Sequence, residues 1–154
     1  MRRLFYCDSV GPIGSVGVLL LRLVVGGAFM FHGCCKIQNP NGPMGWMGPE
    51  APLPGILQAL AAITEFGGGA ALFLGLLTRL GCLGIGCVMV VALGMVHLPK
   101  GDGFVAHKPG ESSFELAAVY LACAVMFFLL GAGRYSADAM LFGGPSTPKP
   151  HGEA

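Results

Sequence analysis

Four long apolar segments constrain the fold of this chain more than any other feature of the sequence. They cover approximately residues 13–35, 54–78, 80–99 and 115–133. A helix needs about 20 mostly apolar residues to cross the hydrocarbon core of a bilayer, and each segment is close to that length. Charged residues make up 11% of the chain, against about 25% in soluble domains. We therefore predict an all-α integral membrane protein, a four-helix bundle formed by residues 1–142.

The connections between the segments predict which helix ends share a side of the membrane. A tight turn at 77–80 joins the second and third segments. Long linkers, QNPNGPMGWMGPEAPLPG and KGDGFVAHKPGESS, follow the first and third. Both linkers then lie on one side and both termini on the other. The side of the termini carries Arg2, Arg3, Arg79, Arg134 and Lys149, and the linker side carries Lys36, Lys100 and Lys108. This excess of positive charge predicts cytoplasmic termini.

The two ends of the chain are predicted to differ in structure. The sequence MRRLFY resembles the start of a signal peptide, but the apolar region that follows is long and contains Arg22. We predict that this region is retained as a membrane helix. Residues 143–154, GGPSTPKPHGEA, contain few apolar residues and are predicted to be a disordered tail.

Net charge and cysteine content narrow the range of functions. A net charge of +1 gives no support for nucleic-acid binding. The six cysteines, at positions 7, 34, 35, 82, 87 and 123, include no C-x-x-C pair. Most lie in apolar runs, where cysteine usually behaves as a small hydrophobe. Cys34 and Cys35 would point about 100° apart on a helix and are poor joint ligands for one ion. We predict neither a disulfide framework nor a cysteine metal site.

Two charges fall near the centres of apolar segments. Charged side chains inside a membrane are costly, and they usually pair with one another or serve a function. At 1.5 Å per residue, Arg22 lies about 14 Å and Glu65 about 20 Å above the inner ends of their segments. We predict a buried Arg22–Glu65 ion pair. Such a pair would fix the register of two helices, or form the charged floor of a cavity.

A second polar layer is expected near the outer ends of the helices. His32, His97 and Glu115 come from three different segments, at similar heights of about 26–28 Å. Lys36 follows one turn beyond His32. Two histidines can ligate a haem, and two histidines with a glutamate can bind zinc or iron. Histidine and glutamate also suit the proton transfers of a quinone head group. Each residue alone is also explained as an ordinary interfacial side chain. The candidate pocket residues are Arg22, His32, Lys36, Glu65, His97 and Glu115.

Four motifs, taken in order, resemble the DoxX family of small four-helix membrane proteins. They are LLLRLVVGGAFMFHGCCK, TEFGGGAALFLGLLTRL, VALGMVHLPKGDGF and FELAAVYLACAVMFFLLGAGRYSAD. The resemblance runs from Leu19 to Asp138. The recurrent features of the family appear here as Arg22, His32, Gly33, Lys36, Glu65, Gly75 to Arg79, His97 and Gly131 to Ser136. Cys34 and Cys35 depart from the usual pattern of the family.

The resemblance implies quinone-linked redox chemistry, because the family is related to the DoxD and DoxX subunits of thiosulfate:quinone oxidoreductase. It also implies a multi-pass protein of a bacterial plasma membrane with protein partners. We expect a membrane subunit of a quinone-linked oxidoreductase system, with a quinone or small-molecule pocket near the outer face. The alternative is a non-catalytic accessory subunit of a larger respiratory or photosynthetic complex. A solute carrier is less favoured, because the sequence shows no inverted repeat.

Overall fold

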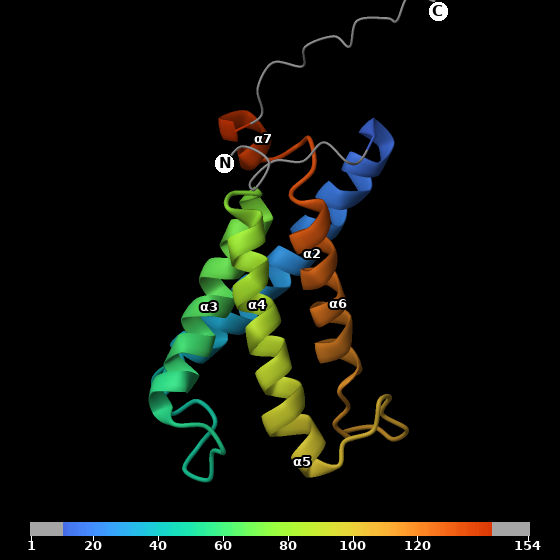
Figure 1. The fold of residues 1–154 in the computed structure, drawn as a ribbon. Coiled ribbons are helices and arrows are strands. Elements are labelled where there is room, and N and C mark those ends of the chain that lie inside the picture. Colours follow the sequence, from blue (N-terminus) through green and yellow to red (C-terminus); the bar gives the residue numbers. More distant parts are fainter. Residues whose placement is uncertain (1–10, 143–154) are drawn as a thin grey trace, which may run out of the picture.

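The computed structural model describes residues 11–142, in which the regular secondary structure is helical and no strand is present. Predictions for MRRLFY, Arg2, Arg3, Cys7, Lys149 and the tail at 143–154 lie outside these residues. The helices are α2 (Pro12–Ile37), α3 (Gly55–Leu74), α4 (Thr78–Val91), a π-helical turn η1 (Ala92–His97), α5 (Leu98–Lys100), α6 (Glu115–Leu130) and α7 (Ala137–Phe142) (Figure 1). The predicted all-α class is confirmed.

Three of the helical segments are long and apolar enough to cross a membrane. They are Pro12–Ile37, Gly55–Leu74 and Thr78–Lys100. The fourth predicted span corresponds to α6, which is apolar but has 16 residues. Large apolar side chains point outward from all four helices, including Leu20, Ile63, Leu83 and Leu129. Contiguous exposed apolar surface of this kind marks a contact with membrane or protein, and it agrees with a bilayer environment.

Helices that are consecutive in the sequence pack against each other. α2 packs on α3, α3 on α4, and α4 on α6. The beginning of α2 and the whole of α7 lie at one end of the molecule, and both long linkers lie at the opposite end (Figure 1). The core between the helices contains Phe29, Leu72, Ile85 and Phe127. The linker end of the molecule therefore brings together the end of α2, the beginning of α3, the end of the α4–η1–α5 segment and the beginning of α6.

Glycine contacts set the antiparallel register of α2 and α3. A Cβ atom on Gly33 would lie 2.4 Å from the backbone nitrogen of Phe66, and one on Gly69 would lie 2.7 Å from that of Met30. Small residues allow such close approach of helix backbones in membranes. In this register Glu65 lies beside the last turns of α2. The beginning of α2 extends beyond the end of α3.

The predicted Arg22–Glu65 ion pair is wrong. Nη1 of Arg22 donates to the Ala132 carbonyl at 2.6 Å, and Nη2 donates to the carbonyls of Tyr135 at 3.2 Å and Phe73 at 3.4 Å. The sequence estimate assumed that the inner ends of the two helices are level. In the structure Arg22 is about 15 Å along α2 yet lies beside Gly75, the residue that ends α3. Arg22 therefore donates hydrogen bonds to backbone carbonyls of the irregular segment after α6, far from Glu65.

Asp138 connects α7 to the turn between α3 and α4. Its carboxylate accepts hydrogen bonds from the backbone N–H of Leu77 at 2.7 Å and of Thr78 at 3.0 Å, and its own N–H donates to the Gly75 carbonyl at 2.8 Å. Leu77 has a positive φ of 49°, which is uncommon for a bulky residue. The carboxylate thus caps the N-terminus of α4 and helps to hold this turn.

Candidate functional site

A cavity of about 230 Å³ lies among α2, α3, α4, η1 and α6, towards the end that carries the long linkers. Its polar lining consists of His32, Lys36, Glu65, His97, Ser113 and Tyr120. Its apolar lining consists of Phe29, Met89, Ala92, Leu116 and Ala117. A small space with a few convergent polar groups on an otherwise apolar wall is typical of a ligand site.

Lys36 and Glu65 form an ion pair that lines the cavity. Nζ of Lys36 lies 2.5 and 2.6 Å from the two carboxylate oxygens of Glu65. The Glu65 side chain is 3% exposed and that of Lys36 is 21% exposed. A buried carboxylate needs a partner of this kind, because an isolated charge out of water is very costly. The pair also places a positive charge at the edge of the cavity.

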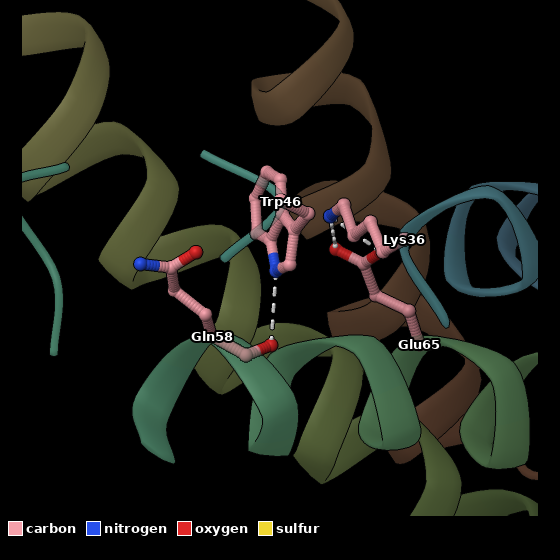
Figure 2. Close-up of polar contacts among 4 residues, drawn as sticks. All are labelled: Lys36, Trp46, Gln58 and Glu65. Atoms are coloured by element: carbon pink, nitrogen blue, oxygen red, sulfur yellow. Dashed lines mark hydrogen bonds and ion pairs between the residues drawn. The ribbon is translucent and has the colours of Figure 1, made fainter. Parts of the chain in front are cut away.

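Trp46 covers this ion pair from the linker between α2 and α3. Its ring centroid is 4.3 Å from Nζ of Lys36, and its Nε1 donates to the Gln58 carbonyl at 3.1 Å (Figure 2). The Gln58 side chain is buried; it accepts from the Met47 N–H at 3.1 Å and donates to the Leu53 carbonyl at 2.9 Å. Gln58 therefore anchors the linker, and the linker holds the indole ring over the ammonium group.

His97 reaches the cavity through the π-helical turn. In an α-helix, five residues rotate a side chain by about 140°, so Ala92 and His97 would point in different directions. The wider π turn reduces this rotation, and both residues line the cavity. Pro99 lies two residues after His97 and has no N–H to donate to the Met95 carbonyl, which favours a changed hydrogen-bond pattern here.

Asp102 holds His97 from the linker that follows. Nδ1 of His97 lies 2.7 Å from Oδ2 of Asp102, and the Ser112 hydroxyl donates to Oδ1 of the same carboxylate. The hydrogen bond from Ser112, together with that from His97, lowers the pKa of the Asp102 carboxyl. The carboxylate is thus held in its charged form beside the imidazole.

Aromatic rings connect α2 and α6 at the cavity. The ring centroid of Tyr120 is 4.8 Å from that of Phe29 and 6.2 Å from that of His32. Among the lining residues, His32 and Leu116 are exposed. Because they come from α2 and α6, the cavity opens between these two helices, on a surface otherwise covered by apolar side chains.

The structure brings together four of the six predicted site residues: His32, Lys36, Glu65 and His97 line one cavity. Arg22 lies at the opposite end of the bundle. Glu115 is in the first turn of α6, exposed and outside the lining, where its charge favours the helix N-terminus. Within residues 11–142, no three His, Cys, Asp or Glu side chains are grouped to hold a metal ion. His32, His97 and Glu115 are not such a group.

Sequence reasoning missed Tyr120, Trp46 and Asp102. Each carried a weak signal: Tyr120 is the polar exception in the apolar run of α6, Trp46 is the single tryptophan, and Asp102 follows His97 by five residues. The cysteines of the described segment, Cys34, Cys35, Cys82, Cys87 and Cys123, are free thiols, and none of them lines this cavity.

Comparison with known proteins identifies the family. The DoxX model matches residues 17–98, which contain Lys36, Glu65 and both cavity histidines. This chain belongs to the DoxX family. The DoxX match ends before α6, so Tyr120 lies outside the matched residues.

Two curated proteins are similar to this DoxX chain over most of their lengths. "Putative oxidoreductase CatD" of Bacillus subtilis (strain 168) is 27% identical over 130 residues, which is 84% of this chain and 90% of CatD. "Inner membrane protein YqjF" of Escherichia coli (strain K12) is 29% identical over 127 residues, covering 82% of this chain and 93% of YqjF. No solved structure matches the chain.

Proposed function

We propose that this DoxX protein is a membrane component of a quinone-linked redox system and binds a quinone head group in the cavity. The observation that carries the proposal is the combination of hydrogen-bond donors with an apolar, aromatic wall. Lys36 and Tyr120 offer donors, and His97 offers an imidazole nitrogen, from three different helical segments. Quinone carbonyl oxygens accept hydrogen bonds, and the flat ring can pack on the Phe29 and Tyr120 rings.

The size of the cavity favours a single-ring ligand. Pockets for drug-sized ligands have volumes of about 300–1,000 Å³, and this one is about 230 Å³. An attached isoprenoid tail would have to remain outside. The opening between His32 and Leu116 lies among outward-facing apolar side chains of α2 and α6, such as Phe31 and Val119. A lipid-dissolved molecule can therefore keep its tail in the bilayer while its ring enters.

The cellular setting proposed is a bacterial inner membrane, with the cavity near the outer face. The names "Inner membrane protein YqjF" and "Putative oxidoreductase CatD" support this setting and the redox class. The cavity is lined by residues near the end of α2 and by residues next to the linker before α6. Both long linkers lie at the end of the molecule opposite α7 (Figure 1). With cytoplasmic termini, as the positive-inside rule predicts, that end faces outward.

Fluorescence of Trp46 provides a direct test, because it is the single tryptophan and lies on Lys36. Protein in nanodiscs is titrated with a benzoquinone carrying a decyl chain. We expect saturable quenching, with affinity reduced about tenfold in His97→Ala, as expected when one hydrogen bond to the ligand is lost. Affinity should also fall in Glu65→Gln, which removes the carboxylate that holds the Lys36 ammonium group at the cavity. His107→Ala, an exposed histidine of the linker, should bind as wild type. Quenching that is linear in quinone, or equal in all variants, would refute the proposal.

A role as an accessory subunit of a larger membrane complex is the second candidate. It is favoured by a groove of about 440 Å³ between α3 and α4, lined largely by small residues that include Gly67, Ala71, Gly81 and Gly84. Such surfaces admit close contact with another membrane helix. Stoichiometric co-purification with a respiratory or photosynthetic complex in mild detergent, abolished by Ala71→Leu, would support this role. Purification as a single component would argue against it.

A further inference from the structure

The His97–Asp102 contact determines which imidazole nitrogen is available in the cavity. Nδ1 lies 2.7 Å from the Asp102 carboxylate, which accepts hydrogen bonds only, so the neutral ring carries its proton on Nδ1. Nε2 has no hydrogen-bond partner among residues 11–142. His97 therefore presents an unprotonated nitrogen, a proton acceptor, to whatever occupies the cavity.

Backbone contacts hold Asp102 against the histidine. The Asp102 N–H donates to the His97 carbonyl at 3.2 Å, and Gly101, with φ of 71°, turns the chain back after α5. On the other side, the Phe114 N–H donates to the Gly103 carbonyl at 3.1 Å, which brings Ser112 to the second carboxylate oxygen. The Asp102 side chain is 9% exposed. The carboxylate is therefore held from both ends of the linker between α5 and α6, and its orientation does not depend on a ligand.

The order of these contacts differs from that of a Ser-His-Asp triad with Ser112 as the nucleophile. In a Ser-His-Asp triad, the serine is hydrogen-bonded to the histidine, and the aspartate holds the other ring nitrogen. Here the Ser112 hydroxyl donates to the carboxylate. Ser112 supports Asp102, and the imidazole is left for acid–base exchange.

The other charged groups around the cavity do not replace Asp102. Lys36 of α2 and Glu65 of α3 are paired with each other. His32 of α2 and Tyr120 of α6 line the cavity, and Lys100 is close enough to Asp102 to act on it electrostatically. Asp102 is thus the carboxylate in direct contact with His97.

We propose that Asp102 is a positioning residue that fixes the Nδ1–H form of His97 and makes Nε2 the proton-exchanging atom of the cavity. The ligand that we propose for this exchange is a quinol, the hydroxylated form of the single-ring ligand. The inference therefore rests on the proposed function. In the exchange, Nε2 gains the proton that a ligand hydroxyl loses, and the Asp102 carboxylate stabilises the resulting imidazolium. No electron moves in this step, and the reverse transfer returns the proton to the ligand oxygen.

The test has one measurement without ligand and one with ligand. In protein labelled with ¹⁵N-histidine, the ¹⁵N shifts report the His97 tautomer, assigned by comparison with His97→Gln. We expect the Nδ1–H form in wild type and in Glu115→Gln, a matched change at an exposed carboxylate outside the cavity. Asp102→Asn should lose this preference and Asp102→Glu should keep most of it. Retention of the wild-type tautomer in Asp102→Asn would overturn the inference.

The second measurement is the pH profile of binding of a short-chain benzoquinol, followed by Trp46 fluorescence. Wild-type affinity should fall as pH decreases, because a proton on Nε2 removes the acceptor for the ligand hydroxyl. Asp102→Asn should bind about tenfold more weakly at neutral pH and lose this pH profile, with recovery in Asp102→Glu. An unchanged profile in Asp102→Asn contradicts the inference. Absence of binding to wild type refutes the proposed ligand, whereas the tautomer measurement still decides the role of Asp102.

Discussion

Lys36 and Glu65 meet across the α2–α3 interface, with Nζ 2.5 and 2.6 Å from the two carboxylate oxygens. Both residues come from segments whose spacing is set by glycine contacts, so the ion pair depends on the register of two backbones. The Trp46 ring lies 4.3 Å from the same ammonium group. The Lys36 ammonium group therefore contacts both Glu65 in the cavity wall and Trp46 in the linker.

Removal of that cation should destabilise the protein. Lys36→Met leaves the Glu65 carboxylate, which is 3% exposed, without its ion pair. We expect a loss of about 3 kcal/mol, at the low end of the range for breaking a buried pair, because Lys36 is partly exposed. Thermal unfolding in detergent measures it. The double variant Lys36→Met/Glu65→Gln should recover most of the loss, and exposed Lys100→Met should change little. Equal stability of Lys36→Met and wild type would contradict this interpretation.

The close packing of α2 on α3 is tested by a pair of glycine substitutions in one helix. Gly33→Ala places a Cβ atom 2.4 Å from the Phe66 backbone nitrogen, whereas Gly27→Ala meets nothing within 4 Å. Overpacking typically costs about 1–3 kcal/mol, so Gly33→Ala should lower the unfolding temperature and weaken ligand binding. Gly27→Ala should be neutral or slightly stabilising. Similar melting temperatures for the two variants would show that the backbones do not touch at Gly33.

Asp138 is expected to stabilise the opposite end of the bundle. Asp138→Ala removes the acceptor for the N–H groups of Leu77 and Thr78, a loss of about 1–2 kcal/mol for a helix cap. Asp138→Asn keeps one oxygen acceptor and should be intermediate. Glu50→Ala, at an exposed carboxylate of the first linker, serves as the control. Thermal unfolding should rank wild type first, then Asp138→Asn, then Asp138→Ala. Any other order would argue against a capping role.

The lowered pKa of Asp102 predicts a pH-dependent contribution to stability. Hydrogen bonds from Ser112 and His97 favour the charged carboxylate in the folded state, so its pKa there is below the unfolded value of about 3.9. The stabilisation is present at neutral pH and is lost as pH falls through the folded-state pKa. The difference in melting temperature between wild type and Asp102→Asn should therefore shrink as pH is lowered from 7 towards 3. A difference that is constant over this range would contradict the assignment.

The helices were predictable because their apolar lengths are set by a bilayer. The predicted segments 13–35, 54–78, 80–99 and 115–133 correspond to α2, α3, the α4–η1–α5 segment and α6. The cavity histidines His32 and His97 were predicted from their heights, which depend only on rise per residue. Lys36 was predicted because it follows His32 by one turn, and Glu65 because it is a charge inside an apolar segment. Which charged side chains pair with one another was not predictable in this way. Arg22 was paired with Glu65 because the sequence gives no measure of the stagger between α2 and α3. That stagger follows from backbone contacts at Gly33 and Gly69.

The remaining site residues depend on local geometry that a regular helix does not describe. His97 lines the cavity because of the π turn, which has no simple sequence pattern. Asp102 and Trp46 belong to linkers rich in glycine and proline. Their positions follow from specific hydrogen bonds, to His97 and to Gln58.

The shortness of α6 bears on the thickness of the surrounding bilayer. A helix of 16 residues is about 24 Å long, whereas the hydrocarbon core is about 30 Å thick. The irregular segment after α6 would then lie at membrane depth, where unpaired carbonyls are tolerated only if the protein satisfies them. Arg22 does so for Ala132 and Tyr135. Lipids beside α6 would have to thin locally to match it, so shorter acyl chains should favour this protein.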